Sequence, residues 1–313
     1  MGVILGVDGG NSKTELVAAS TDGEVLALVR GPGSSSHAIG AAGTGGVIDT
    51  LAREAGVALP ADVGVYYLCG ADVPSDIAEL EEVVAAGGFS RASVVDNDTF
   101  ALLRAGTGRD DAIAVICGSG INCVGRAANG RVARYPSLGW ETGDWGGGDM
   151  LAREAIFLAA RAEDGRGEQT ALVEAVGSHF GAPSVEAVGV DVHYRRLPHS
   201  RLAELAPVVV AAAEAGDRVA RSLVDRLARE IALLVERALR DLGVDEADVV
   251  LGGGMLASGA GFFYDLVVAG LPRGVHPIAL TDRPVVGAAL AALDVAGAGE
   301  AAKARLREEL RGR

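Results

Sequence analysis

The stretch GVDGGNSKT, Gly6–Thr14, follows a short apolar run, Val3–Leu5, of the kind that forms a buried strand. A glycine pair after a strand gives a backbone loop that can approach a phosphate closely. Asp8, however, stands directly before the two glycines, and a carboxylate beside a phosphate is repulsive. The stretch therefore suggests a ligand whose phosphate is accompanied by a cation.

This stretch begins a longer unit, Val3–Arg30, which reads as a strand, a glycine loop, a second strand, an Asp22-Gly23 turn and a third strand. A second segment, Asp111–Tyr135, has the same order, with the loop Gly118-Ser119-Gly120 and an Asn129-Gly130 turn. Asp-Gly and Asn-Gly between strand-like runs are strong short-range signals for a hairpin. The sequence thus predicts two similar three-stranded units.

Two unrelated hairpins would be the alternative explanation. Strand length, loop type and turn type all agree, so we favour a duplicated unit, with a domain boundary near Gly106–Asp111. Gly243 suits the residue that follows a helix. Since strands alternate with helices, the sequence predicts an α/β class. Periodicity predicts helices at Ser75–Ala86, Met150–Ala162, Leu202–Ala215, Asp217–Leu242 and from Glu300 onward, and strands at Ala92–Asp96 and Asp248–Leu251.

The composition of the chain argues against several classes of function. The chain has 313 residues and 49% apolar residues, enough for two domains with sizeable cores. A formal net charge of −14 argues against binding a nucleic-acid backbone. Three cysteines and no C-x-x-C pair fit a reducing compartment better than a disulfide framework or a zinc site. No apolar stretch is long enough for a membrane span and the N-terminus lacks a basic signal-peptide region, so we expect a cytoplasmic protein without membrane partners.

The two glycine loops together suggest a phosphate chain held by backbone N–H groups from both units. Mg²⁺ bound near Asp8 would then lie between its carboxylate and the phosphate oxygens. Lys13 could add a positive charge, and hydroxyl donors are available from Ser12, Thr14 and Ser119. Either loop alone is better explained as a tight hairpin turn.

The stretch VVDNDTFALL, Val94–Leu103, places Asp96, Asn97 and Asp98 at the end of a strand, with a helix starting at Thr99. A carboxylate in this position often caps the helix. Phosphoryl transfer to a hydroxyl, however, needs a carboxylate that orients or accepts the substrate proton. Asp98 is therefore the candidate base, and capping is the alternative.

Two further glycine-rich stretches could contact a ligand. SLGWETGDWGGGDM, Ser137–Met150, holds both tryptophans of the chain, and an aromatic face beside a carboxylate suits a sugar. A glycine-rich turn with a tryptophan in the core explains it equally well. VVLGGGML, Val249–Leu256, could support an adenine or a ribose on flat glycine backbone, although a triple glycine alone is a weak signal.

With these motifs in this order, the chain resembles the BadF/BadG/BcrA/BcrD ATPases and, among them, the N-acetylglucosamine kinase-like sugar kinases of the actin/hexokinase/Hsp70 superfamily. The resemblance runs from GVDGGNSKT to RPVVGAALAAL and so covers nearly the whole chain. It implies two duplicated ribonuclease H-like (actin-like ATPase) domains with an interdomain nucleotide cleft. The expected limits are residues 1–108 and 109–297, with a terminal helix at about 298–313 packing back on the first domain.

The resemblance also implies roles for individual residues. Asp98 matches the catalytic base and Asp8 the metal site, with ATP and Mg²⁺ as cofactors. ATP and phosphate contacts fall on Gly9, Gly10, Asn11, Ser12, Lys13, Thr14, Gly118, Ser119, Gly120, Gly252, Gly253 and Gly254. Sugar contacts fall on Ser35, Ser36, Asn97, Asp98, Gly139, Trp140 and Asp144.

The sequence departs from the pattern at two places. Trp145 follows Asp144 where the family has Glu, and Ser35-Ser36 stand where the sugar kinases carry Asn-His. The resemblance implies an ATP-dependent kinase for N-acetylglucosamine or glucosamine, acting on the 6-hydroxyl, and a homodimer. The alternatives are a reductase-activating ATPase, whose cluster cysteines would be sought at Cys117 and Cys123, and a sugar sensor without enzymatic activity.

Overall fold

The computed structural model describes residues 2–312, which form two compact units. Unit 1 contains the chain up to Ala114, Val124–Pro136 and the chain from Leu280 on. Unit 2 contains Val115–Cys123 and Ser137–Ala279. This division assigns the C-terminal segment to unit 1, and it falls within strands of the second sheet rather than at residue 108; the domain limits inferred from the sequence stay predictions.

Two five-stranded sheets share one strand order. The first has the order β3-β2-β1-β4-β5 and the second β10-β9-β6-β7-β8, which is the same order once β6, β7 and β8 are matched to β1, β2 and β3. The duplicated three-stranded unit predicted from the sequence is thus confirmed. The first sheet consists of β1 (Val3–Gly9), β2 (Lys13–Ser20), β3 (Val25–Pro32), β4 (Ala61–Leu68) and β5 (Ser90–Asn97). The second consists of β6 (Ala112–Cys117), β7 (Ile121–Arg126), β8 (Val132–Arg134), β9 (Ala247–Gly252) and β10 (Val275–Ala279).

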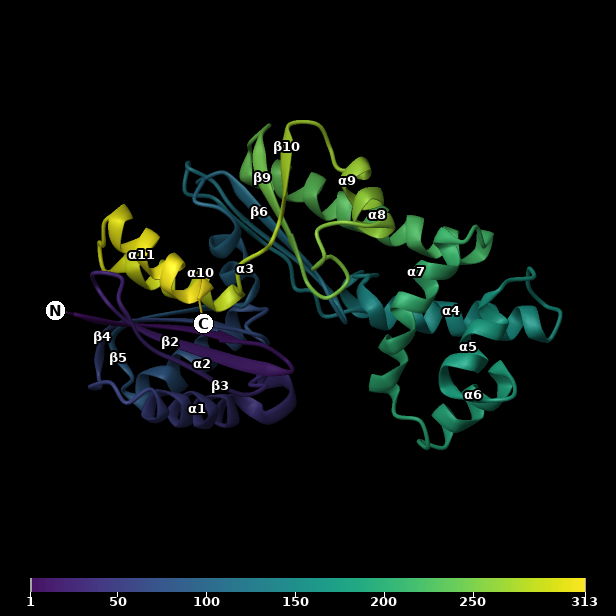
Figure 1. Ribbon diagram of the computed structural model, residues 1–313, viewed down its shortest axis with the longest axis horizontal. Coiled ribbons are helices and arrows are strands. Elements are labelled where there is room, and N and C mark those ends of the chain that lie inside the picture. Colours follow the sequence, from purple (N-terminus) through teal and green to yellow (C-terminus); the bar gives the residue numbers. More distant parts are fainter. Residues whose placement is uncertain (1, 313) are drawn as a thin grey trace. The chain divides into compact units, whose positions relative to one another are not determined.

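Alternation along the strands of the first sheet builds two cores, one on each face. Leu5, Val7 and Leu16 face α1 (Ser36–Glu54) and α2 (Pro74–Gly87), whereas Ile4 and Val17 face α10 (Pro284–Val295) and α11 (Glu300–Arg311). Figure 1 shows these two helical layers on opposite faces of the sheet. The carboxyl ends of the parallel strands β1, β4 and β5 therefore lie between two packed layers.

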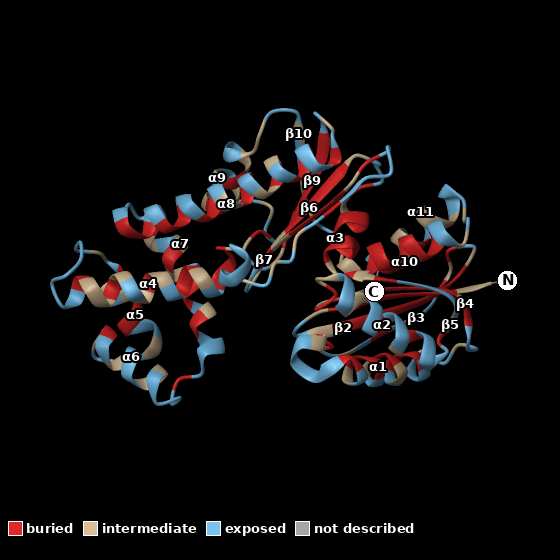
Figure 2. Ribbon diagram, turned by 180° about the vertical axis from the view of Figure 1, so that it is seen from behind, coloured by how far each residue is buried: buried red, intermediate tan, exposed pale blue. Residues whose placement is uncertain are grey.

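Helix α10 is buried on almost all sides, as its red colour in Figure 2 shows. It packs on β1 and on α3 (Thr99–Gly106) at very short range. A side chain at Gly6 would collide with the backbone of Ala289, and one at Gly287 would collide with the backbone of Ala101. Glycine at both positions lets α10 approach the strand and the helix that follows the candidate base.

Unit 2 is mostly helical beyond its strands. The predicted helix Asp217–Leu242 is confirmed as α8, with Asp217 capping it through Ala220 N and Gly243 ending it at φ 69°. The predicted helix Leu202–Ala215 is divided instead, because Pro207 lies in the first turn of α7 and cannot occupy a helix interior. The helices are η1 (Trp140–Thr142), α4 (Gly147–Glu163), α5 (Leu172–Phe180), α6 (Val185–His193), η2 (His199–Leu205), α7 (Ala206–Glu214), α8 (Arg218–Leu242) and α9 (Phe262–Gly270).

Candidate active site

In unit 1 the first glycine loop joins β1 to β2. Gly10 N donates to Lys13 O at 2.9 Å, and Asn11 and Ser12 are exposed at the tip. Lys13 is not free, since its Nζ lies 2.9 Å from Glu15 Oε2. Thr14 is fully buried and donates to Ser34 Oγ at 2.7 Å, so its hydroxyl supports the loop rather than facing solvent.

Asp8 lies near the end of β1, one residue before the loop, and is 8% exposed. Burial raises the pKa of its carboxyl to about 8; Asp98 and Glu15 act in the same direction and Lys13 opposes them. Within residues 2–312 no hydrogen bond to this carboxylate is found. A buried carboxylate with two negative neighbours fits a cation in its vicinity.

At the end of β5 three polar residues have three different tasks. Asp96 is held by the Arg134 guanidinium, with Nη2 and Oδ2 2.8 Å apart. Asn97 Oδ1 accepts from Thr99 N at 2.9 Å and so caps α3. Asp98, at the N-cap position of the same helix, makes no capping hydrogen bond with its side chain. Its half-buried carboxylate is thereby left available for another role.

The pKa of the Asp98 carboxyl is raised to about 7 by burial and by the negative charge of Asp72, whereas the backbone N–H groups of Thr99 and of Asp98 itself oppose the rise. Asp72 follows β4 and accepts from Asn97 Nδ2 at 2.7 Å. Its own pKa is raised to about 6 by burial, against the opposing charge of His37. A carboxyl whose pKa lies near neutrality can accept a proton from a substrate hydroxyl.

No motif in the sequence pointed to Asp72 or His37 as site residues. His37 Nδ1 lies 3.8 Å from Asp72 Oδ2, and its Nε2 lies 3.8 Å from Asp76 Oδ2. The preceding serine, Ser36, donates through Oγ to Gly70 O at 3.3 Å, which joins the start of α1 to the segment after β4. The apolar run 61–68 is the signal that could have identified Asp72. This run forms β4, and Asp72 follows β4 much as Asp98 follows β5.

Of the predicted sugar contacts, unit 1 brings together four. Ser36 contacts Gly70, Asn97 contacts Asp72, and Ser35, only 4% exposed, is the N-cap residue of α1. Asp98 adjoins Asn97 in the chain, and the negative charge of Asp72 raises its pKa. The four residues lie at the end of β5 and at the start of α1, and their contacts Gly70 and Asp72 follow β4.

The other predicted sugar contacts lie in unit 2. Gly139 adopts φ 94° before η1, and Trp140 within it is 68% exposed. Asp144 accepts a hydrogen bond from the Thr142 hydroxyl. Trp145, which departs from the family pattern, is 4% exposed, donates to Glu154 Oε2 at 3.2 Å and stacks under Arg226. Trp145 is therefore a core residue, and Trp140 is the tryptophan open to a ligand.

The second and third glycine stretches meet in unit 2. Met255 N donates to Cys117 O at 3.1 Å, and Gly253, at φ 89°, leaves no room for a side chain against the Cys117 backbone. Gly148 N, at the start of α4, donates to Gly118 O at 2.8 Å. The strand-end loop after β6, the loop after β9 and the start of α4 thus form one assembly.

A cavity of about 590 Å³ opens beside this assembly. Gly118, Ser119 and Gly254 line one side, and Met255 and Phe263 provide apolar surface. Helix α7 completes the lining with Ala206, Pro207, Val210, Ala211 and Glu214. Side chains added at Gly120 or Gly254 would meet nothing within 4 Å, whereas Gly252 is the buried last residue of β9. Glycine backbone beside an apolar wall is typical of a site for a planar base and its phosphates.

Cys117 and Cys123 are fully buried in the strands β6 and β7. Burial raises the pKa of the Cys117 thiol to about 12 and that of Cys123 higher still. Within residues 2–312 no group of three His, Cys, Asp or Glu side chains is arranged to hold a metal ion. The same residues include no helix with the length and apolar character of a membrane span.

Several known proteins are similar to this chain in sequence or in structure. The chain is 29% identical over 273 residues to an N-acetylmuramic acid/N-acetylglucosamine kinase from Clostridium acetobutylicum, covering 85% of this chain and 89% of that protein. It is 26% identical to an N-acetyl-D-glucosamine kinase from Dictyostelium discoideum, covering 93% and 98%. Among solved structures it resembles a protein from Chromobacterium violaceum described as a candidate N-acetylglucosamine kinase, with a TM-score of 0.69, 24% identity, and 93% and 98% of the two chains covered.

The structural likeness confirms the expected fold class, an α/β fold of duplicated actin-like ATPase type. The family model of the BadF/BadG/BcrA/BcrD ATPases matches residues 5–292, which is most of the chain. The protein is a member of the BadF/BadG/BcrA/BcrD ATPase family.

Proposed function

We propose that this protein is an ATP-dependent kinase that phosphorylates N-acetylglucosamine or a closely related amino sugar. The observation that carries the proposal is the uncapped Asp98 carboxylate at the start of α3, with its pKa raised to about 7. The names of the two relatives, both N-acetylglucosamine kinases, support the substrate class.

In the proposed reaction Asp98 accepts the proton of a sugar hydroxyl, the 6-hydroxyl, as that oxygen attacks the γ-phosphorus of ATP. Ser35, Ser36 and Asn97 are the proposed sugar contacts in unit 1, and the contacts expected at Gly139, Trp140 and Asp144 stay predictions. Asn97 has a second role, because its Oδ1 accepts a hydrogen bond from Thr99 N at the start of α3. Gly10 N and Gly118 N already donate to Lys13 O and Gly120 O, so the exposed loop residues Asn11, Ser12 and Ser119 are the proposed donors to phosphate oxygens.

The apolar cavity of unit 2 suits the adenosine of ATP, with Gly252–Gly254 and Ser119 near its phosphates. In the first loop Asn11 and Ser12 are exposed, and in the second loop a side chain at Gly120 would meet nothing within 4 Å, so both loops have positions open to phosphate oxygens. Asp8 fits Mg²⁺, since it is buried among negative neighbours and Mg²⁺ is usually held by one or two carboxylates plus substrate phosphates and waters. When bound, Mg²⁺ would neutralise charge on the phosphate oxygens.

A coupled ADP-release assay tests the proposal. Mg-ATP is offered with a panel of hexoses, amino sugars and N-acetylated sugars, including N-acetylmuramic acid, and without sugar. Sugar-dependent ADP release with an N-acetylated amino sugar is the expected result. ADP release that is the same with and without every sugar would contradict the proposal.

The reductase-activating alternative receives no support from the structure, because an interface cluster needs accessible thiolates and both Cys117 and Cys123 are enclosed. A sensor without activity would be expected to lack the base or a phosphate loop, and the chain retains the candidate residues for both, Asp98 and the two glycine loops. The cytoplasmic location and the homodimer inferred from the sequence stay predictions.

A further inference from the structure

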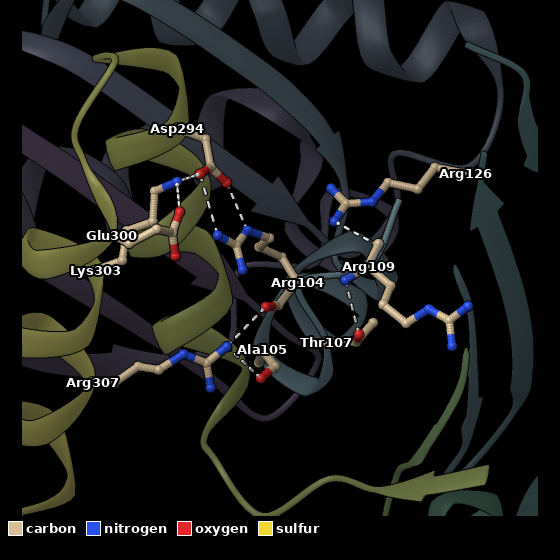
Figure 3. A network of polar contacts seen from close by, with 9 residues as sticks. All are labelled: Arg104, Ala105, Thr107, Arg109, Arg126, Asp294, Glu300, Lys303 and Arg307. Carbon is tan, nitrogen blue, oxygen red and sulfur yellow. Dashed lines mark hydrogen bonds and ion pairs between the residues drawn. The ribbon is translucent and has the colours of Figure 1, made fainter. Parts of the chain in front are cut away.

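Unit 1 contains a second large cavity, of about 610 Å³, that the proposed reaction does not use. It lies at the C-terminal end of α3, beside α10, α11 and the end of β7 (Figure 3). Its polar lining includes Arg104, Arg126, Asp294, Glu300, Lys303 and Arg307. Four cationic side chains on one cavity are notable in a protein with a formal net charge of −14.

Carboxylates contact three of these cations. Asp294 accepts from Arg104 Nε at 2.6 Å and lies 2.7 Å from Lys303 Nζ, which is also 2.8 Å from Glu300. Arg307 is paired with Asp282 at 2.7 Å, and Asp282 is not part of the cavity lining. A third lining carboxylate, Asp110, is exposed. Among the lining side chains four cations therefore stand against three carboxylates, and Arg126 is the one without a carboxylate partner among the contacts described.

Arg126 is the cation whose charge is least satisfied. Its Nε is buried and has no hydrogen-bond partner, and its Nη2 reaches only the Arg109 carbonyl at 3.4 Å. Figure 3 shows this guanidinium on the opposite side of the cavity from the Arg104–Asp294 pair. A guanidinium presents its donors as a planar fork that matches phosphate oxygens, so an anion in the cavity would satisfy it.

The cavity is joined to the candidate base by α3. Asp98 precedes the first residue of this short helix, and Arg104 lies in its last turn. Arg307 Nη2 donates to the carbonyls of Arg104 at 3.4 Å and Ala105 at 3.0 Å, so the same cationic cluster caps the helix. Helix α10 fixes the middle of α3 through the close approach of Gly287 to Ala101. Ordering one end of so short a helix constrains the other.

We infer that this cavity binds a phosphate group, as inorganic phosphate or as a phosphomonoester such as a sugar phosphate, and that the bound anion steadies the C-terminal end of α3. Arg126 supplies the donors that lack a partner, and Arg104, Lys303 and Arg307 supply the surrounding positive charge. The site differs from the glycine loops, which belong to the proposed reaction, and it would exist even if the chain were not a kinase.

Calorimetric titration of the ligand-free protein at low ionic strength, without ATP, tests this site. Inorganic phosphate and glucosamine 6-phosphate are titrated separately. Binding of both would show that the phosphate group suffices, and binding of the ester alone would identify a phosphorylated sugar as the ligand. Absence of binding by either at millimolar concentration would overturn the inference. Because no turnover is measured, failure here is distinct from failure of the proposed kinase activity.

Two variants locate the binding. Arg126→Gln removes the free donors and is expected to weaken binding about tenfold or more, the loss typical of a charge-assisted hydrogen bond. Arg131→Gln removes an exposed arginine five residues away and leaves the same net charge, so it is expected to bind as the unaltered protein does. Equal weakening in both variants, or none in Arg126→Gln, would contradict the assignment.

Hydrogen exchange provides a readout that does not depend on a variant. Saturating the unaltered protein with whichever probe binds is expected to slow amide exchange at the end of α3 and in α11, but not in α8 of unit 2. Protection confined to the glycine loops would place the anion at the nucleotide site and overturn the inference.

Discussion

Asn97 Oδ1 accepts a hydrogen bond from the backbone N–H of Thr99 at 2.9 Å and thereby caps α3. This relationship decides the role of the next residue. Capping was the alternative explanation for Asp98, and in the structure Asn97 fulfils it. The Asp98 carboxylate is left at the carboxyl edge of the sheet, buried enough to have a pKa of about 7.

The first prediction concerns Asp98→Asn. The amide keeps the shape of the side chain but cannot accept the hydroxyl proton, so turnover is expected to fall by roughly 10²- to 10⁴-fold. ATP affinity, measured separately by calorimetry, is expected to remain nearly unchanged. Asp49→Asn makes the same chemical change in the exposed part of α1 and serves as the control. Near-normal turnover in Asp98→Asn would remove this residue from the mechanism.

The second prediction concerns pH. A base must be unprotonated to act, so kcat/KM is expected to rise with pH and to level off above the pKa of Asp98, about 7. In Asp98→Asn the residual kcat/KM is expected not to rise with pH in this range. A rate already at its plateau at pH 5 in the unaltered protein would show that Asp98 is ionised well below neutrality, against the account.

The third prediction concerns Asp72→Asn. Asp72 is the main charged neighbour that raises the pKa of Asp98, so removing its charge is expected to move the acidic limb of the kcat/KM profile to lower pH. Asn keeps a carbonyl oxygen that can still accept from Asn97 Nδ2, which limits the structural effect. A limb that stays in place, with only the plateau lowered, would mean that Asp72 acts by binding substrate instead.

The fourth prediction concerns the cavity in unit 2. Gly254→Val adds a side chain where nothing lies within 4 Å, so folding should be preserved while space for the nucleotide is lost. Affinity for a non-hydrolysable ATP analogue is expected to fall about tenfold or more, as one poorly accommodated group commonly does. Gly270→Val, at the exposed end of α9, is the control. Equal affinities in the two variants would place the nucleotide elsewhere.

The fifth prediction concerns stability in the absence of ligands. Asp8 has a pKa of about 8 in the folded protein against 3.8 for an unperturbed aspartate, so between these two pH values the folded state keeps a proton that the unfolded state has lost. This contribution to stability is present at low pH and declines as pH rises toward 8. Urea unfolding therefore should show that the free energy of unfolding falls less between pH 6 and pH 9 in Asp8→Asn than in the unaltered protein. The same loss in both would contradict the assigned burial of this charge.

Local signals predicted much of this fold. The Asp22-Gly23 and Asn129-Gly130 turns both form, with φ of 84° and 82° at their glycines, and each joins the strands expected. Such turns are determined by neighbouring residues, which a sequence displays directly. Helix α1 was not predicted, because its run of glycines and the kink at Gly40 hide the helical pattern.

The rest depends on contacts between distant segments. Strand β4 pairs with β1 across more than fifty residues of sequence, and only this pairing brings Asp72 beside Asn97. Likewise α10 is apolar on every side, so periodicity could not show that it lies against β1 and α3. The choice of Asn97 over Asp98 as the helix cap depends on side-chain geometry that composition does not reveal.

The central claim is that the chain transfers phosphate to an amino sugar. Mass spectrometry of a reaction containing the protein, Mg-ATP and N-acetylglucosamine tests it most directly. The account predicts a sugar phosphate that accumulates in step with ADP and is absent with Asp98→Asn. ADP accumulating with no phosphorylated product, from N-acetylglucosamine or any related amino sugar, would contradict it.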